Sequence, residues 1–321
     1  MSAAQERADS RGVALVFGAA AALGTLGVIS TLAYREGMPA PVFTALRAAL
    51  GALILGTLVM MRWQPSVSLR SLAMPERRML AVAIVANGSM NLLLFAGFSV
   101  MTVAIVMTLF YTYPVLVMVA MAAMRQERVT PVRLGALGLA MAGLVLVVGS
   151  QVGPDAQVTL AGVSLALAAA VCQAAYLVVS RDGYTSVPAV QATSLILLGG
   201  MLISGTAALL TGGFASPDTW GVEPVVWIAV LLAGTIGAAI PKVMVLMGVR
   251  RIGGTRTAMV MLAEPVVAVV SAAIVLGQPV TLPEVLGGGA ILLAAALVQR
   301  PPLADRRTAL SQAATVIGSH E

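Results

Sequence analysis

An acidic residue inside an apolar segment is the first candidate for chemistry in this sequence. Glu264 lies beside Pro265 near the middle of an apolar segment that runs from Thr255 to Thr281. An ionised carboxylate in hydrocarbon is costly, so such a residue faces protein or water and usually has a partner. Two roles are open for Glu264: a site for a proton or a substrate amine, or a structural ion pair that holds a helix broken at the proline.

Two basic residues also fall within apolar segments. Lys242 is expected at a depth similar to that of Glu264, where the two would pair; the alternative is that Lys242 snorkels to the nearby interface. Arg47 would either bind a substrate carboxylate through two parallel N–H groups or cap helix carbonyl groups of a neighbouring segment.

Uncharged polar residues at helical spacing accompany these charges. Asn87 and Asn91 are four residues apart, and Gln173 and Tyr176 are three apart, so each pair shares one helix face. Any one alone would be an interhelical hydrogen bond worth about 1 kcal/mol or less in a membrane. Together we expect them to line one cavity. The full polar set is Asn87, Asn91, Thr108, Tyr111, Thr112, Tyr113, Gln173 and Tyr176.

Prolines and glycines mark where helices break or pack closely. Three prolines within apolar segments are predicted to break helices, which either frees carbonyl groups to line a cavity or bends a helix to fit its neighbours. They are Pro114, Pro241 and Pro265. Two groups of glycines are predicted to bring helices close together. They are Gly135, Gly138 and Gly143, and Gly287 to Gly289.

The composition excludes several classes of protein. Hydrophobic residues make up 59% of the 321-residue chain and charged residues only 10%. Cys172 is the only cysteine and His320 the only histidine, so no disulfide and no metal site are predicted. The sequence has no phosphate-binding loop and no basic face with stacking aromatic residues, so no cofactor and no nucleic acid are expected. Intramembrane hydrolysis needs a nucleophile with a base, paired aspartates or a metal motif, so we do not expect an enzyme.

The apolar segments predict an all-α integral membrane protein with ten transmembrane helices, since about 20 apolar residues cross ~30 Å of hydrocarbon. The predicted spans are 12–33, 40–61, 79–98, 102–123, 133–150, 160–180, 189–212, 225–248, 256–276 and 284–299. Residues 1–11 are expected to be a cytoplasmic N-terminal segment without a cleaved signal peptide. Residues 300–321 are expected to be a disordered cytoplasmic tail.

The arginine distribution predicts the orientation. Cytoplasmic loops carry an excess of Lys and Arg. With the N-terminus in the cytoplasm, Arg35 is the one basic residue left on the outer side, and an even number of spans returns the C-terminus to the cytoplasm. The predicted location is the plasma membrane, with both termini cytoplasmic.

The chain contains an internal sequence repeat of two copies. At a displacement of 151 residues Pro114 matches Pro265 and Val129-Thr130 matches Val280-Thr281, while Tyr113 stands where the second copy has Glu264. The copies cover 12–150 and 160–299 and hold five predicted helices each. An odd number forces the second copy to enter the membrane from the opposite side, which predicts two inverted repeats with a substrate path between them.

These motifs resemble the EamA family of the drug/metabolite transporter superfamily over residues 12–299. The matching residues are Tyr113-Pro114-Val115 followed by Glu127-Arg128-Val129-Thr130, Glu264-Pro265-Val266 followed by Gly277-Gln278-Pro279-Val280-Thr281, and Arg47. The resemblance implies a ten-helix carrier for small metabolites, most often an exporter, with a cavity between the halves. Gln278 departs from the family, which usually carries an acid there to match Glu127.

The expected function is a secondary transporter that exports a small metabolite, either amino acid-like or amphipathic and cationic. The alternatives are an uptake permease of the same fold, or a membrane receptor or scaffold without transport. The expected partners are the small-molecule substrate and the lipid bilayer, with protons as the candidate coupling ion. The protein would be a monomer or a homodimer.

The orientation has a direct test. A cysteine placed at residue 35 should react with an impermeant thiol reagent from outside the cell, and a cysteine at residue 128 should react only from the cytoplasmic side. The reverse pattern would overturn the predicted topology.

Overall fold

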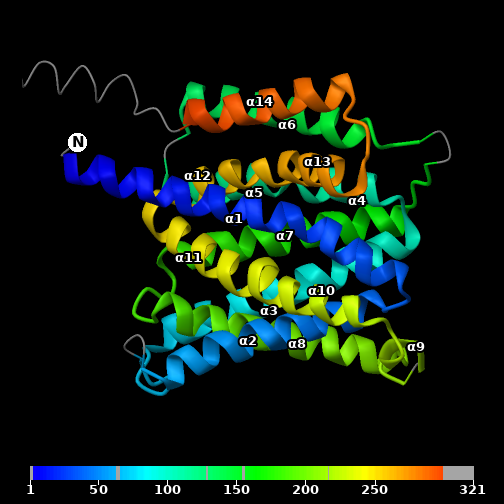
Figure 1. Ribbon diagram of the computed structural model, residues 1–321. Coiled ribbons are helices and arrows are strands. Elements are labelled where there is room, and N and C mark those ends of the chain that lie inside the picture. Colours follow the sequence, from blue (N-terminus) through cyan, green and yellow to red (C-terminus); the bar gives the residue numbers. More distant parts are fainter. Residues whose placement is uncertain (1–2, 63–65, 128, 154–155, 216, 299–321) are drawn as a thin grey trace, which may run out of the picture.

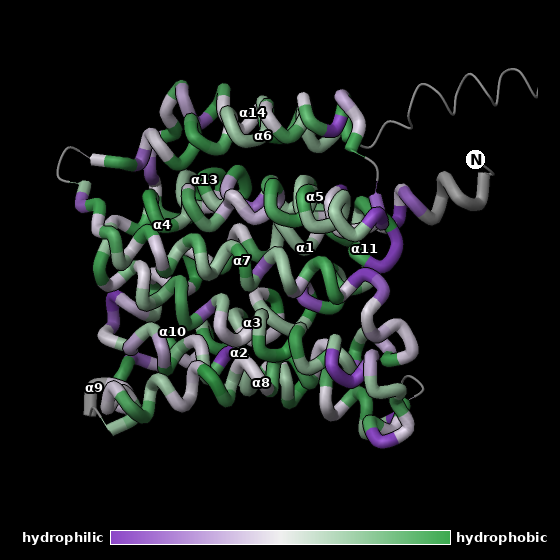
Figure 2. The backbone as a smooth tube through the Cα atoms, turned by 180° about the vertical axis from the view of Figure 1, so that it is seen from behind, coloured by the Kyte–Doolittle hydropathy of each residue, from purple (hydrophilic) through white to green (hydrophobic). Residues whose placement is uncertain are grey.

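The computed structural model describes residues 3–62, 66–127, 129–153, 156–215 and 217–298. Every regular element within these ranges is a helix, and the long helices run side by side as a bundle (Figure 1). Hydrophobic residues dominate the middle of the bundle, and the most hydrophilic ones gather at the end where the chain begins (Figure 2). This distribution is that of a multi-pass membrane protein.

The two halves of the chain supply similar sets of helices. The first half contains α1 (Ala3–Arg35), α2 (Ala40–Met60), α3 (Met74–Val100), α4 (Val103–Phe110), α5 (Tyr113–Ala123) and α6 (Pro131–Gly149). The second half contains α7 (Leu160–Asp182), α8 (Ala189–Leu210), α9 (Pro217–Trp220), α10 (Pro224–Gly234), the π-helical turn η1 (Thr235–Ala239), α11 (Ile240–Ile252), α12 (Gly254–Met261), α13 (Ala263–Leu276) and α14 (Leu282–Val298).

Nine stretches of the described chain are long and apolar enough to cross a membrane. Three of them are broken spans, made of α4 with α5, α10 with η1 and α11, and α12 with α13. The tenth predicted span is the apolar helix α14, whose 17 residues rise about 26 Å and so fall short of a ~30 Å hydrocarbon core. The helix α1 already begins at Ala3, within the segment expected to precede the first span. The predicted tail, 300–321, lies outside the described residues.

Each of the three prolines stands in the first turn of the helix that follows a break. Pro114 is the second residue of α5, Pro241 the second of α11, and Pro265 the third of α13. Proline lacks an N–H group and clashes with the preceding turn of a helix, so it is accommodated where a helix starts. The breaks lie near the middle of their spans and place Tyr111 and Glu264 there.

Helices from the two halves interleave. The helix α2 packs on α8 at one edge of the bundle, and α6 packs on α14 at the opposite edge (Figure 1). Between these edges α1 packs on α11 and α13, and α7 packs on α3 and on α4 with α5. Both halves of the chain therefore contribute helices to the interior of the bundle.

The pair α6–α14 is in backbone contact through two glycines. A Cβ atom on Gly143 would lie 2.6 Å from the Gly287 carbonyl oxygen, and one on Gly287 would meet the Gly143 carbonyl oxygen in turn. The prediction of close-packing glycines is thus right for these two positions. It is wrong for Gly135, Gly138 and Gly289, because a Cβ atom on any of them would enter open space.

The contrast between two neighbouring glycines gives a matched test of this contact. Gly287→Ala should destabilise the protein by about 1–3 kcal/mol, because its Cβ atom meets backbone that has no room to move. Gly289→Ala should be neutral or slightly stabilising, since alanine favours a helix over glycine. Thermal unfolding of the two purified variants measures the difference, and equal midpoints would contradict the close approach.

Candidate functional site

A small polar cavity lies about halfway along the helices where α2, α3, α8, η1 and α11 meet, on the side of the bundle where α2 packs on α8. Its polar lining residues are Thr44, Arg47, Asn87, Asn91, Ser204 and Lys242. The cavity volume is about 20 Å³. A water molecule needs roughly 10–15 Å³, so the cavity holds one or two water-sized groups and no metabolite. In this conformation the helices are closed around the polar residues.

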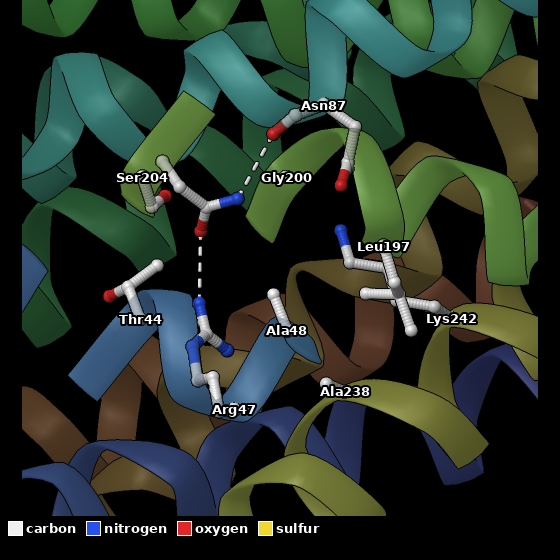
Figure 3. Close-up of a pocket in the computed structure, with 10 residues that line it drawn as sticks. Thr44, Arg47, Ala48, Asn87, Leu197, Gly200, Ser204, Ala238 and Lys242 are labelled. Carbon is white, nitrogen blue, oxygen red and sulfur yellow. Dashed lines mark hydrogen bonds between the residues drawn. The ribbon is translucent and has the colours of Figure 1, made fainter. Parts of the chain in front are cut away.

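Arg47 is held by an amide side chain. Its Nη2 donates to Asn91 Oδ1 at 3.0 Å, and Asn91 Nδ2 donates to the Asn87 carbonyl oxygen at 3.0 Å (Figure 3). The prediction that Arg47 caps helix carbonyl groups is therefore wrong for this conformation, because Asn91 caps the carbonyl and Arg47 binds Asn91. Both bonds together fix the orientation of the Asn91 amide and leave most N–H groups of the guanidinium for other acceptors.

Lys242 also points into the interior and does not snorkel to the interface. Its Nζ lies 5.4 Å from the centre of the Tyr176 ring, within the range of a cation–π contact. Arg47 and Glu264 are both close enough to act on its charge. The four ion pairs found within 4.0 Å in the described chain do not include Lys242 with Glu264. The predicted pair is therefore a longer-range interaction here and no direct salt bridge.

Glu264 has an aromatic neighbourhood. The Tyr111 hydroxyl group is close enough to hydrogen-bond with the Glu264 carboxyl group, and the charges of Lys242 and Arg47 also act on it. Tyr111 and Tyr113 are buried, and their rings cluster with that of Phe110 at centre distances of 5.3 to 6.4 Å. Glu264 itself is partly buried. A carboxyl group thus stands next to a phenol hydroxyl, which can both donate and accept a hydrogen bond.

The remaining predicted residues divide into two groups. Asn87 and Gln173 are buried, and each has a side-chain polar atom without a hydrogen-bond partner. Thr108 and Thr112 instead bond to carbonyl groups of their own helical turns, at 2.9 and 2.6 Å, so they contribute no free hydroxyl group to a cavity. The structure therefore brings together Arg47, Asn87, Asn91 and Lys242 and leaves the two threonines aside.

Sequence reasoning missed Thr44 and Ser204, which also line the cavity. Thr44 lies three residues before Arg47 and so shares a helix face with it, which is a signal that could have identified it. Ser204 has no polar residue three or four positions away, and such hydroxyl residues most often bond to their own helix backbone.

A second polar cluster surrounds Glu127 at the end of the bundle where α1 begins. Its Oε2 accepts from Arg133 Nη1 at 3.3 Å, and its Oε1 accepts from Arg181 Nη1 at 3.3 Å and from the Thr255 backbone N–H at 3.4 Å. These bonds join α6, α7 and α12. In the same turn of α12, Arg256 pairs with Asp9 of α1 at 2.7 Å.

Glycine is required beside the Glu127 carboxylate. Gly253 has φ +84°, and a Cβ atom there would lie 2.6 Å from Glu127 Oε1. Side chains rarely adopt this backbone region, so glycine permits both the turn and the approach of the carboxylate. The residue that matches Glu127 in the second copy is Gln278, and it is exposed. The two ends of the bundle are therefore not equivalent.

Comparison with known proteins decides the family. The model of the EamA-like transporter family matches residues 10–149 and, a second time, residues 160–300. The chain belongs to this family. The resemblance found in the Tyr113-Pro114 and Glu264-Pro265 motifs is thereby confirmed.

Other comparisons concern the fold of this EamA-family protein. Comparison with curated proteins gives no significant match. One protein of known crystal structure shares 20% sequence identity with this chain, with a TM-score of 0.77. The match covers 90% of this chain and 96% of that chain, so the same fold occurs in an experimental structure over nearly the full length.

The interaction between Lys242 and Glu264 can be measured by a double-mutant cycle. Leaving either charge alone in the interior should cost more than removing both. We expect Lys242→Met with Glu264→Leu to be at least about 1 kcal/mol more stable than the sum of the single losses. Thermal unfolding gives the coupling. As a control, Lys242→Met combined with Glu223→Gln, an exposed acid, should be additive. Additive losses in the first pair would contradict an interaction.

Proposed function

We propose that this EamA-family protein is a secondary transporter that exports a small metabolite, amino acid-like or amphipathic and cationic, across the plasma membrane. One observation supports this most. Polar residues of the first half, Arg47 and Asn91, and Lys242 of the second half line one small cavity about halfway along their helices. Membership of a transporter family argues against an enzyme and against a receptor or scaffold without transport.

We infer that the two halves are inverted repeats that give alternating access. The packing supports this inference. A shift of 150 or 151 residues relates α1 to α7, α3 to α11 and α5 to α13. The contacts of α7 with α3 and α5 then correspond to the contacts of α1 with α11 and α13. The same shift turns α2 into α8 and α6 into α14, so each of the pairs α2–α8 and α6–α14 maps onto itself. A two-fold axis in the membrane plane would relate such contacts, and transporters with this symmetry bind substrate at the repeat interface.

The arginine distribution supports assigning the end near Glu127 to the cytoplasm, with both termini there. Opening the cavity to the cytoplasm would then separate α6, α7 and α12, which the Glu127 cluster joins. Hydrogen bonds between ionised groups are stronger than neutral ones, so this cluster would bias the closed state at that end. Uptake through the same fold would use the same steps in reverse.

Glu264 is the candidate proton site. No phosphate-binding loop occurs in the sequence, so an ion gradient or the gradient of the substrate itself would supply the energy. The Tyr111 hydroxyl can donate to the ionised carboxylate and accept from the protonated acid. Glu264 can therefore keep a hydrogen-bonding neighbour in both states, as a residue that takes up and releases a proton during transport must.

Transport by Glu264→Gln tests this function. Wild-type protein in proteoliposomes on a solid support should give a substrate-dependent current with some of a set of amino acids and cationic drugs, and a pH gradient should change that current. Glutamine keeps the size of the side chain and removes its proton, so the variant should lose transport or its dependence on the pH gradient.

The exposed acid Glu223 provides the matched control, and Glu223→Gln should behave as wild type. Unchanged transport with unchanged pH dependence in Glu264→Gln would contradict the proton site. Folding of each variant is checked by its elution as a single species in detergent.

A further inference from the structure

The polar cavity carries more positive than negative charge. Arg47 and Lys242 both line it, and they extend from α2 and α11 toward α3 (Figure 3). Glu264 is not among its lining residues. The acceptor that the structure shows for Arg47 is the neutral Asn91 amide, and Lys242 faces the Tyr176 ring. Two cations that are near enough to repel each other therefore face a cavity with no acidic residue in its lining.

The same space has hydrogen-bond donors without acceptors. Asn87 Nδ2 and Ser204 Oγ are buried, line the cavity and have no partner within the described chain. A buried donor without an acceptor costs about 1–3 kcal/mol. An amide N–H accepts nothing, so Asn87 needs an acceptor from a bound group. A cationic amine would bring further donors and a third positive charge.

The donors are held in place and leave a defined volume. Asn91 binds both Arg47 and the Asn87 backbone, which sets α2 against α3 at the cavity. The rest of the lining is apolar and consists of Leu197 and the small residues Ala48, Gly200 and Ala238. Its volume of about 20 Å³ suits a single small polar group.

We propose that this cavity binds the carboxylate group of a substrate, between Arg47 and Lys242, with Asn87 and Ser204 as further donors. The planar guanidinium matches two carboxylate oxygens, which favours this group over the larger tetrahedral phosphate. The proposal rests on the proposed transport function and narrows it to substrates that carry a carboxylate. The rest of the substrate would occupy space that forms when α2 and α11 move apart.

Three compounds of one shape test the charge requirement. The probes are 3-phenylpropanoate, its neutral amide 3-phenylpropanamide, and the cation 3-phenylpropylamine, with acetate and phenylalanine as smaller and zwitterionic carboxylates. Binding to the full purified chain is read from its thermal unfolding. A saturating carboxylate should raise the midpoint by about 2–4 °C or more, and the amide and the amine should not.

Variants test whether the rise in the unfolding midpoint comes from binding in the cavity. Arg47→Gln and Lys242→Gln should each abolish the shift with carboxylates, and exposed Arg35→Gln, which removes a cation elsewhere, should keep it. Ala48→Leu keeps every charge and fills the cavity, so it should also abolish the shift. If Arg47→Gln or Lys242→Gln does not fold, Ala48→Leu still tests whether carboxylates bind in the cavity.

Several results would overturn the carboxylate site: no shift with any carboxylate, a shift with the amine alone, or an equal shift in Arg47→Gln, Lys242→Gln and wild type. Counterflow in proteoliposomes separates this site from the transport function. Carboxylates that bind at the cavity while no compound is transported would support the site and contradict transport. Transport of amines that Arg47→Gln leaves unchanged would support transport and overturn the site.

Discussion

Charged residues inside a membrane-spanning bundle must be stabilised by their neighbours, and this requirement shapes the interior of the structure. Arg47, Lys242 and Glu264 lie away from the ends of their spans, and none of the three is neutralised by a direct salt bridge in the described chain. Arg47 binds an amide, Lys242 lies over an aromatic ring, and Glu264 lies beside a phenol hydroxyl. Such contacts stabilise a charge less than a salt bridge does, so the charges stay available to a solute, at a cost in folding stability that is typical of functional sites.

Because the helices of the two halves interleave, charged and polar residues from both halves line the same cavity. The cations come from α2 and α11 and the amides from α3, so any movement of one half relative to the other changes the cavity. At one end of the bundle Glu127 joins three helices, while the matching Gln278 is exposed. Of these two matching positions, only Glu127 joins helices through its side chain in the part of the chain that the structure describes. If the two halves are inverted repeats, as we propose, this difference favours one of two related conformations.

The sequence was sufficient for what depends on hydropathy and spacing. Nine of the ten predicted spans, four polar residues of the cavity and the family follow from apolar length, helical periodicity and the repeated motifs. The four residues are Arg47, Asn87, Asn91 and Lys242. Side-chain direction could not be predicted. The spacing placed Lys242 and Glu264 at one depth, but it did not show that Lys242 lies over the Tyr176 ring or that the two charges form no direct salt bridge. Thr108 and Ser204 look alike in sequence, yet one bonds its own helix and the other faces the cavity. Likewise Gly287 and Gly289 differ only in which side of α14 meets Gly143.

Accessibility of residue 204, which lines the cavity, shows whether the cavity opens alternately to the two sides of the membrane. With the single native cysteine removed by Cys172→Ser, a cysteine at position 204 is exposed to an impermeant thiol reagent from each side of oriented vesicles. Alternating access should give labelling from both sides, and faster labelling from the cytoplasmic side when Glu127→Gln weakens the Glu127 cluster. Labelling from one side only, with or without Glu127, would contradict it.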